Sequence, residues 1–203
     1  MSLLQNESLR KFFSGRRRFQ LAWIFAILLI FSAKQYPSAI GIAICFLGAT
    51  LRSISSGFLR KEAKLAVGGP YSHTRNPLYL GTYIMALAAP LSVGAYWLAA
   101  VAAFVFYLNY HYVIAHEEAK LPSYFGDAYL KYCELVPRFL PRFSSPPRAQ
   151  LEEINPDPAG YVFNFPLAKQ NKVFEAYVTF VAIIAGMYLL VWAKSLLPPN
   201  YAF

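Results

Sequence analysis

The sequence is poor in charge and in cysteine. Charged residues make up 14% of its 203 residues, whereas soluble domains usually contain about 25%. The two cysteines are Cys45, in an apolar run, and Cys133, in a basic stretch. Two cysteines can form neither a disulfide framework nor a four-cysteine zinc site. The low charge argues against an ordinary water-soluble domain.

Several common sequence motifs are also missing. The chain has no Gly-x-Gly-x-x-Gly turn, no phosphate-binding loop and no set of His, Cys, Asp or Glu residues at metal-ligand spacing. No Ser-His-Asp arrangement is indicated. His111 stands alone in an apolar run beside Tyr107 and Tyr110, a setting more typical of a packed ring than of a catalytic one. We therefore predict no metal site.

Apolar residues are abundant, at 57% of the chain, and they gather in five long runs. A helix that crosses a bilayer perpendicularly needs about 20 such residues, so the shorter runs need flanking turns or a thinned bilayer. We predict an all-α, polytopic membrane protein with about five transmembrane helices. The predicted spans are Phe19–Ala33, Ser38–Leu51, Leu78–Val93, Tyr96–Ala115 and Val173–Trp192.

The basic residues predict the orientation. With the N-terminus in the cytoplasm, all of the 19 Lys and Arg residues except Lys34 and Lys194 fall on the cytoplasmic side. This is the positive-inside pattern, and it argues against a nucleic-acid surface. The C-terminus then lies on the opposite side. Arg16-Arg17-Arg18 before a short apolar run resembles a secretory signal, but we expect the segment to be a retained span.

The chain divides into three predicted segments. Residues 1–65 hold the basic N-terminus and a first transmembrane hairpin, residues 66–142 a second hairpin with the polar motifs, and residues 143–203 a proline-rich stretch and the last span. Proline removes backbone donors and breaks helices. We therefore expect Arg138–Lys172 to be a cytoplasmic linker with little helix, in preference to a lid over a binding site.

A turn rich in glycine and proline precedes the third span. Its residues run from Gly68 to Tyr79. Asn76 is suited to cap a helix that begins at Pro77. A helix start beside Arg75 attracts anions such as a carboxylate. The alternative is a simple helix cap with an arginine that anchors the span at the interface.

Two adjacent acids, Glu117 and Glu118, follow the fourth span. Carboxylates at a membrane boundary are costly unless they are solvated or paired, so a water-exposed helix end is the simplest interpretation. The third and fourth spans form a hairpin, however, which returns the acids to the membrane face of Arg75. This convergence predicts a cofactor pocket at the cytoplasmic face.

The stretch from Leu121 to Pro141 alternates aromatic and charged residues. Its apolar spacing is typical of an amphipathic segment that lies on a membrane interface. It is either a surface helix or a cover that closes the pocket over the hairpin.

Two motifs in this region resemble the isoprenylcysteine carboxyl methyltransferases and the related membrane phospholipid methyltransferases. The resemblance covers about residues 66–141. The motifs are Gly69-Pro70-Tyr71 with Arg75-Asn76-Pro77-Leu78-Tyr79, and Glu117-Glu118-x-x-Leu121-x-x-x-Phe125-Gly126-x-x-Tyr129-x-x-Tyr132-x-x-x-Val136-Pro137-Arg138.

The resemblance implies a multi-span enzyme that binds S-adenosylmethionine at the cytoplasmic face, releases S-adenosylhomocysteine and methylates an amphiphilic lipid or prenylated acceptor from the bilayer. It implies catalytic roles for Arg75, Glu117 and Glu118. The cofactor-binding set is Tyr71, His73, Arg75, Asn76, Pro77, Tyr79 and Glu118. Asn76 stands where the family has histidine, so an acid–base role is lost there; His73 is a substitute ring nearby.

Two other function classes stay open. Membrane sterol and steroid reductases, which use NADPH, are distantly similar in their C-terminal helices. A non-catalytic protein that keeps the methyltransferase fold is the third hypothesis, because of Asn76. Among acceptors, a carboxylate needs little acid–base help, whereas an amine would need Glu117 or Glu118 as a base. We expect Arg75 to pair with a carboxylate of cofactor or substrate.

Overall fold

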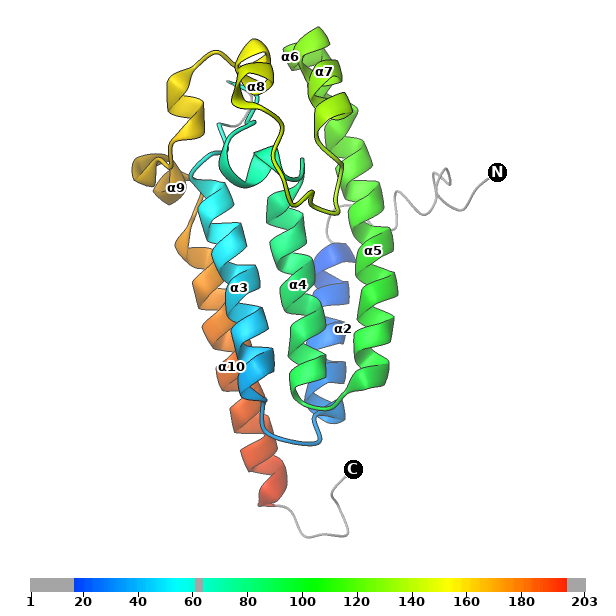
Figure 1. Ribbon diagram of the computed structural model, residues 1–203. Helices are drawn as coiled ribbons and strands as arrows, with labels where there is room; N and C mark the ends of the chain where they lie inside the picture. Colours follow the sequence, from blue (N-terminus) through cyan, green and yellow to red (C-terminus); the bar gives the residue numbers. More distant parts are fainter. Residues whose placement is uncertain (1–16, 61–63, 197–203) are drawn as a thin grey trace, which may run out of the picture. The chain divides into compact units, whose positions relative to one another are not determined.

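The structure is a computed structural model that describes residues 17–60 and 64–196 (Figure 1). All regular elements in these residues are helical, which confirms the predicted all-α class. In chain order they are α2 (Arg17–Ser32), α3 (Ala39–Ser56), η2 (Gly69–Ser72), α4 (Pro77–Ser92), α5 (Tyr96–Glu118), α6 (Leu121–Phe125), α7 (Asp127–Leu135), α8 (Arg148–Ile154), η3 (Pro158–Tyr161), α9 (Phe165–Gln170) and α10 (Phe174–Ser195).

Each of the five predicted apolar segments forms a helix: α2, α3, α4, α5 and α10. Within the described residues, α3, α5 and α10 are long and apolar enough to cross a membrane. Helices α2 and α4 have 16 residues each, fewer than the about 20 that a perpendicular crossing needs. The chain is an all-α membrane protein, and the count of five crossings stays a prediction.

Some of the residues that predict the orientation lie outside the described residues. This applies to Arg10, Lys11, Arg16 and Lys61 among the basic residues, and to residues 197–203 at the C-terminal end. The placement of the two termini on opposite sides of the membrane therefore stays a prediction.

The described chain divides into two compact units. The first unit contains residues 17–47, 83–115 and 178–196, and the second contains residues 48–60, 64–82 and 116–177. Helices α3, α4, α5 and α10 each contribute residues to both units. All the candidate site residues belong to the second unit.

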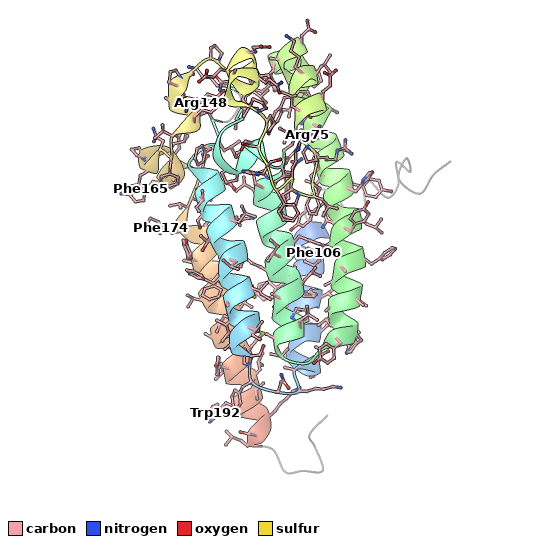
Figure 2. The ribbon with its side chains drawn as sticks, in the orientation of Figure 1. Arg75, Phe106, Arg148, Phe165, Phe174 and Trp192 are labelled. Atoms are coloured by element: carbon pink, nitrogen blue, oxygen red, sulfur yellow. The ribbon has the colours of Figure 1, made fainter. Side chains whose placement is uncertain are left out.

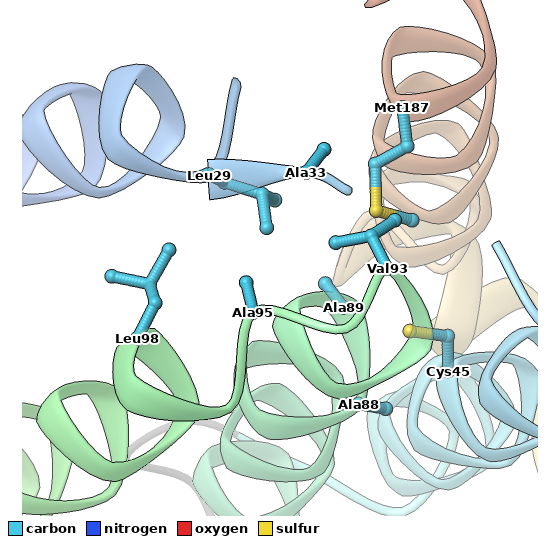
Figure 3. Packing of buried hydrophobic residues seen from close by; sticks show 9 residues of the cluster. All are labelled: Leu29, Ala33, Cys45, Ala88, Ala89, Val93, Ala95, Leu98 and Met187. Atoms are coloured by element: carbon cyan, nitrogen blue, oxygen red, sulfur yellow. The ribbon is translucent and has the colours of Figure 1, made fainter. Parts of the chain in front are cut away.

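The core of the first unit is built from small and medium apolar side chains of α2, α3, α4, α5 and α10 (Figure 3). Alanine is frequent in it, and small side chains let helices approach closely in a membrane, where burial of apolar surface gives little driving force. The buried cluster consists of Leu29, Ala33, Cys45, Ala88, Ala89, Val93, Ala95, Leu98 and Met187.

Large apolar side chains of the first unit are exposed, as a bilayer requires. Trp192, labelled in Figure 2 near the end of α10, is 52% exposed. Others on the same unit are Trp23, Phe31, Ile40, Phe104, Val181 and Leu189. Exposed apolar surface of this extent is typical of contact with lipid.

A lysine joins the ends of two helices in the first unit. The Nζ atom of Lys194, in the last turn of α10, donates to the carbonyl oxygens of Phe31 at 2.8 Å and Ala33 at 3.0 Å. The last carbonyls of a helix have no donor within the helix. Lys194 therefore caps the C-terminal end of α2.

The second unit has its own core, in which α7 packs against α8 (Figure 1). The buried residues are Leu65, Val67, Tyr129, Tyr132, Val136, Leu151 and Ile154. The predicted amphipathic segment after α5 is helical, but Gly126 divides it into α6 and α7. Gly126 has φ +53° and ψ −134°, a conformation that glycine adopts and other residues avoid.

The proline-rich stretch is not the linker with little helix that we expected. It forms α8, η3 and α9, and Leu151 and Ile154 of α8 are buried in the core of the second unit. The Asn155 Nδ2 atom donates to the Leu65 carbonyl at 2.9 Å. Pro158 and Pro166 occupy first-turn positions of η3 and α9, where a missing N–H costs nothing, and Pro147 is the N-cap of α8.

We predict that Gly68→Ala destabilises the second unit. A methyl group at Gly68 would overlap the Gly160 carbonyl oxygen and lie 2.8 Å from Cα of Tyr161. Both obstacles are backbone, so the loops must separate, and overpacking of this kind costs about 1–3 kcal/mol. Thermal unfolding in detergent should show a lower melting temperature.

The matched control is Gly186→Ala in α10. A methyl group there meets nothing within 4 Å, and alanine is a better helix former than glycine by about 1 kcal/mol. This variant should unfold at or above the wild-type temperature. Equal losses in the two variants would contradict the close approach of Gly68 to Gly160.

Candidate functional site

The turn before α4 is held in place by its own side chains. Helix α4 begins at Pro77, and the Asn76 carbonyl accepts from the Leu80 N–H at 3.0 Å. Asn76 therefore occupies the predicted cap position. Its side chain does not cap the helix, however, because the Asn76 Nδ2 atom donates to Glu118 Oε1 at 3.1 Å and to the Arg138 carbonyl at 2.9 Å.

The side chain of Arg75, labelled in Figure 2, is 12% exposed and pairs with Glu118. Its Nε donates to Glu118 Oε1 at 3.0 Å and its Nη2 to Glu118 Oε2 at 3.4 Å, while Nη1 donates to the carbonyls of Cys133 and Val136. Burial by itself lowers the pKa of the guanidinium, but Glu118 outweighs that effect and the pKa is raised. Arg75 stays charged, and most of its donors are used within the second unit.

Glu118 is the centre of this network. It is 8% exposed and pairs with Arg75 on one side and with Arg138 Nε, at 2.7 Å, on the other. Both carboxylate oxygens accept charge-assisted bonds, which are stronger than neutral ones. Arg138 was not among the predicted site residues; its only signal in the sequence is its place at the end of the second motif.

Glu117 differs from its neighbour, because it is exposed. Its Oε1 accepts a hydrogen bond from the Tyr79 hydroxyl at 2.6 Å. Tyr71 is buried nearby, and its pKa is raised first by burial and then by the charge of Glu117. Tyr71 therefore keeps its phenol proton across the physiological range, while Glu117 keeps acceptor capacity for a ligand.

A cavity of about 400 Å³ lies in the second unit, within the range of small-molecule sites. Its polar wall contains all the predicted site residues except one: Tyr71, Arg75, Asn76, Pro77, Tyr79, Glu117 and Glu118. Helices α6 and α7 contribute a cover that consists of Leu121 and four aromatic residues: Tyr124, Phe125, Tyr129 and Tyr132. The segment after α5 therefore closes one side of the cavity, as one of our two alternatives predicted.

His73 is the predicted site residue that does not line the cavity. Its Nδ1 lies 2.9 Å from the Arg142 carbonyl, and its own carbonyl accepts from the Arg142 N–H at 3.0 Å. A carbonyl only accepts, so Nδ1 carries the proton. His73 thus fastens the turn to the chain that follows α7. His111 lies in the first unit, packed against the rings of Tyr107 and Tyr112.

A third wall of the cavity was not predicted. It consists of Leu59, Arg60, Lys64, Leu65 and Ala66, with Lys120 from the chain after α5. The Arg60 Nη1 and Lys64 Nζ atoms both bind Asp157 Oδ2, at 2.6 and 2.8 Å. Asp157 is more than 90 positions away in the chain, so no local pattern indicates this pairing.

The described residues contain no group of three or more His, Cys, Asp or Glu side chains that could hold a metal ion. The polar wall instead offers hydrogen-bond acceptors, an amide and aromatic faces. Such a set suits an organic ligand that carries hydroxyl or cationic groups.

Comparison with known proteins supports the predicted resemblance. Residues 41–128 match the family model of the phospholipid methyltransferases. The chain is 33% identical over 129 residues to the protein-S-isoprenylcysteine O-methyltransferase of Schizosaccharomyces pombe, covering 58% of this chain and 53% of the relative. Both matches confirm the resemblance, and the family match includes all the predicted site residues.

Two further relatives have names that refer to metal resistance. The chain is 30% identical to the nickel-cobalt-cadmium resistance protein NccN of Alcaligenes xylosoxydans xylosoxydans (64% of this chain, 58% of the relative). It is also 30% identical to the cobalt-zinc-cadmium resistance protein CzcN of Cupriavidus metallidurans (64% and 56%). The chain thus spans somewhat more than half the length of these relatives. No solved structure gives a significant match.

We predict that Arg75→Gln destabilises the protein far more than Arg138→Gln. Loss of the Arg75 guanidinium removes two hydrogen bonds to the buried carboxylate of Glu118 and the donor to two backbone carbonyls. Breaking a buried ion pair costs about 3–5 kcal/mol. The Arg138 side chain is 42% exposed, where an ion pair contributes about 0–1 kcal/mol. Melting temperatures in detergent compare the two variants, and equal losses would contradict this ranking.

The Asp157 ion pairs predict a pH dependence. Hydrogen bonds from Lys64 and from the Ala159 N–H lower the pKa of the Asp157 carboxyl. A lowered pKa stabilises the fold above the unfolded value of about 3.9, and this contribution is lost as the pH falls through the lowered pKa. The gap in melting temperature between wild type and Asp157→Asn should therefore be constant near neutral pH and close in acid. A gap that persists unchanged in acid would contradict it.

Proposed function

Since residues 41–128 match the phospholipid methyltransferases, we propose that the protein is an integral membrane methyltransferase that binds S-adenosylmethionine in the cavity of the second unit. Its acceptor is the carboxylate of a lipid-like molecule of the isoprenylcysteine type. The observation that carries the proposal is the juxtaposition of Tyr71, Tyr79 and Glu117 with the Arg75–Glu118 pair around one cavity.

The residues present fit this cofactor. It carries a cationic sulfonium, an amino group and ribose hydroxyls, all of which favour a carboxylate acceptor or an aromatic face. Glu117 offers the carboxylate, and Tyr71 and Tyr79 offer aromatic faces. When bound, the cofactor supplies an electrophilic methyl group whose transfer to a carboxylate neutralises both charges.

Arg75 and Glu118 have a positioning role in this proposal. They are bound to each other. Glu118 also binds Arg138 and Asn76, and Arg75 also donates to two backbone carbonyls. Because these bonds fix the start of α4 against the chain after α7, they hold Tyr79 and Glu117 at the cavity. Asn76 fills the place of the family's histidine as a neutral donor within this network.

The protein's own contribution to the reaction is alignment and exclusion of water. A carboxylate acceptor is already a nucleophile, so Glu117 need not remove a proton. The aromatic cover of α6 and α7 shields the cavity. Holding donor and acceptor in line can contribute about 7–11 kcal/mol to a reaction of this kind.

The basic residues support a cytoplasmic location for the site. Arginine and lysine are frequent in residues 48–82 and 116–177, the sequence of the second unit, and such residues favour the cytoplasmic side of a membrane. We propose that the N-terminus and the second unit face the cytoplasm and that the C-terminus lies on the opposite side.

Binding of the cofactor tests the proposal first. Isothermal titration in detergent should show saturable binding of S-adenosylmethionine and a rise in melting temperature. Glu117→Gln and Tyr79→Phe should each weaken it about tenfold, the effect of losing roughly 1.4 kcal/mol. Lys131→Gln, an exposed change on α7 outside the cavity wall, is the control and should bind like wild type.

Methyl transfer tests it second. The protein is incubated with radiolabelled S-adenosylmethionine and an N-acetylated, S-prenylated cysteine, and the expected product is a base-labile methyl ester. Preferential binding of NADPH would favour the reductase hypothesis instead. Cofactor binding without transfer to any prenylated or phospholipid acceptor would indicate a non-catalytic protein.

A further inference from the structure

The third wall of the cavity carries positive charge beside apolar surface. Arg60 and Lys64, in the chain after α3, line the cavity together with Lys120. Leu59 precedes Arg60 and Leu65 follows Lys64 in the chain, and both leucines line the cavity as well. A wall of this kind offers cations and hydrocarbon to one ligand.

Among the residues that the structure describes, the charge of this wall is only partly neutralised. Asp157 Oδ2 accepts from both Arg60 and Lys64, while Oδ1 accepts from the Ala159 N–H at 3.1 Å. One carboxylate thus faces two cations. Asp157 does not line the cavity, whereas Arg60 and Lys64 do.

The other cation–acid pair of the cavity differs in this respect. Arg75 is matched by buried Glu118, which also binds Arg138. A guanidinium has five N–H donors and an ammonium three. Within the described part of the chain, the side chains of Arg60 and Lys64 each donate once, to Asp157. They therefore retain donors for a ligand, and the donors of Arg75 are largely used.

We propose that Arg60 and Lys64 form an anion-binding subsite that holds the negatively charged head of the acceptor, with its apolar chain along Leu59 and Leu65. This inference deepens the proposed function and rests on it. The subsite makes the protein selective for anionic over neutral amphiphiles, because a neutral head gives the remaining donors of Arg60 and Lys64 no charged acceptor. Lys120, exposed on the same cavity, adds to the positive field.

The proline-rich segment positions this subsite. Asp157 holds both cations, and Asn155 binds the Leu65 carbonyl while the Tyr161 hydroxyl binds the Asn155 carbonyl at 2.8 Å. Two residues of the segment, Asn155 and Asp157, thus hold Arg60, Lys64 and Leu65, and Tyr161 holds Asn155 in place. This gives the segment a role that a flexible linker would not have.

The test compares two ligands that differ in head charge. One is an N-acetylated, S-prenylated cysteine with a free carboxylate, and the other is its carboxamide. Their affinities are measured without cofactor, by scintillation proximity, on the full chain in nanodiscs of phosphatidylcholine. The wild type should bind the acid at least tenfold more tightly than the amide, and the preference should shrink as salt is raised.

The decisive variant is Arg60→Gln with Lys64→Gln. It should lose most of the preference for the acid and keep its affinity for the amide within about twofold. Its affinity for S-adenosylmethionine should be unchanged, which also checks that the protein is folded. An undiminished preference for the acid would overturn the subsite and reduce the Asp157 contacts to structural ion pairs.

Two controls separate charge from folding. Arg60→Lys with Lys64→Arg keeps both cations and should keep the preference for the acid. Lys131→Gln with Lys169→Gln removes two cations that do not line the cavity and should behave like wild type. Loss of preference in either control would overturn the assignment to Arg60 and Lys64.

Failure of the anion-binding subsite can be distinguished from failure of the proposed methyltransferase function. A wild type that forms no methyl ester but binds the acid through Arg60 and Lys64 would keep the subsite and reject the methyltransferase. A wild type that forms the ester and whose Gln variant still prefers the acid would keep the methyltransferase and reject the subsite.

Discussion

The buried carboxylate of Glu118 joins three parts of the second unit. It receives Arg75 and Asn76 from the start of α4 and Arg138 from the chain after α7, while it belongs itself to the last turn of α5. A buried carboxylate without partners would be very costly. Because these partners come from two stretches of chain outside α5, the cost of leaving Glu118 unpaired keeps the three stretches together.

This arrangement gives two adjacent acids different tasks. Glu118 is enclosed by cations and an amide, whereas Glu117 is exposed and bound by the Tyr79 hydroxyl. Glu118 holds the walls of the cavity together, and the carboxylate of Glu117 can still accept hydrogen bonds from a ligand. The separation follows from helix geometry, since neighbouring residues on a helix project about 100° apart and meet different surroundings.

The cavity is also divided by charge. The wall formed by α4 and α5 presents acids and phenols to the cavity. The wall after α3 presents Arg60 and Lys64, which are paired with Asp157. The proposed reaction joins a cationic donor and an anionic acceptor, and this division offers each of them a wall of opposite charge. Aromatic side chains of α6 and α7 cover the space between the walls.

Much of this molecule follows from local sequence. Apolar runs predict the membrane helices, and Pro77 predicts the start of α4, because hydropathy and helix starts depend on neighbouring residues. The adjacent acids, together with Arg75, predict a polar pocket at one end of a hairpin. The partners of each polar group depended on tertiary structure. Arg75 binds Glu118, His73 turns to Arg142, and Asp157 reaches Arg60 across more than 90 residues. Ion pairs and hydrogen bonds form between groups that folding brings within about 3 Å, and no local pattern records that distance.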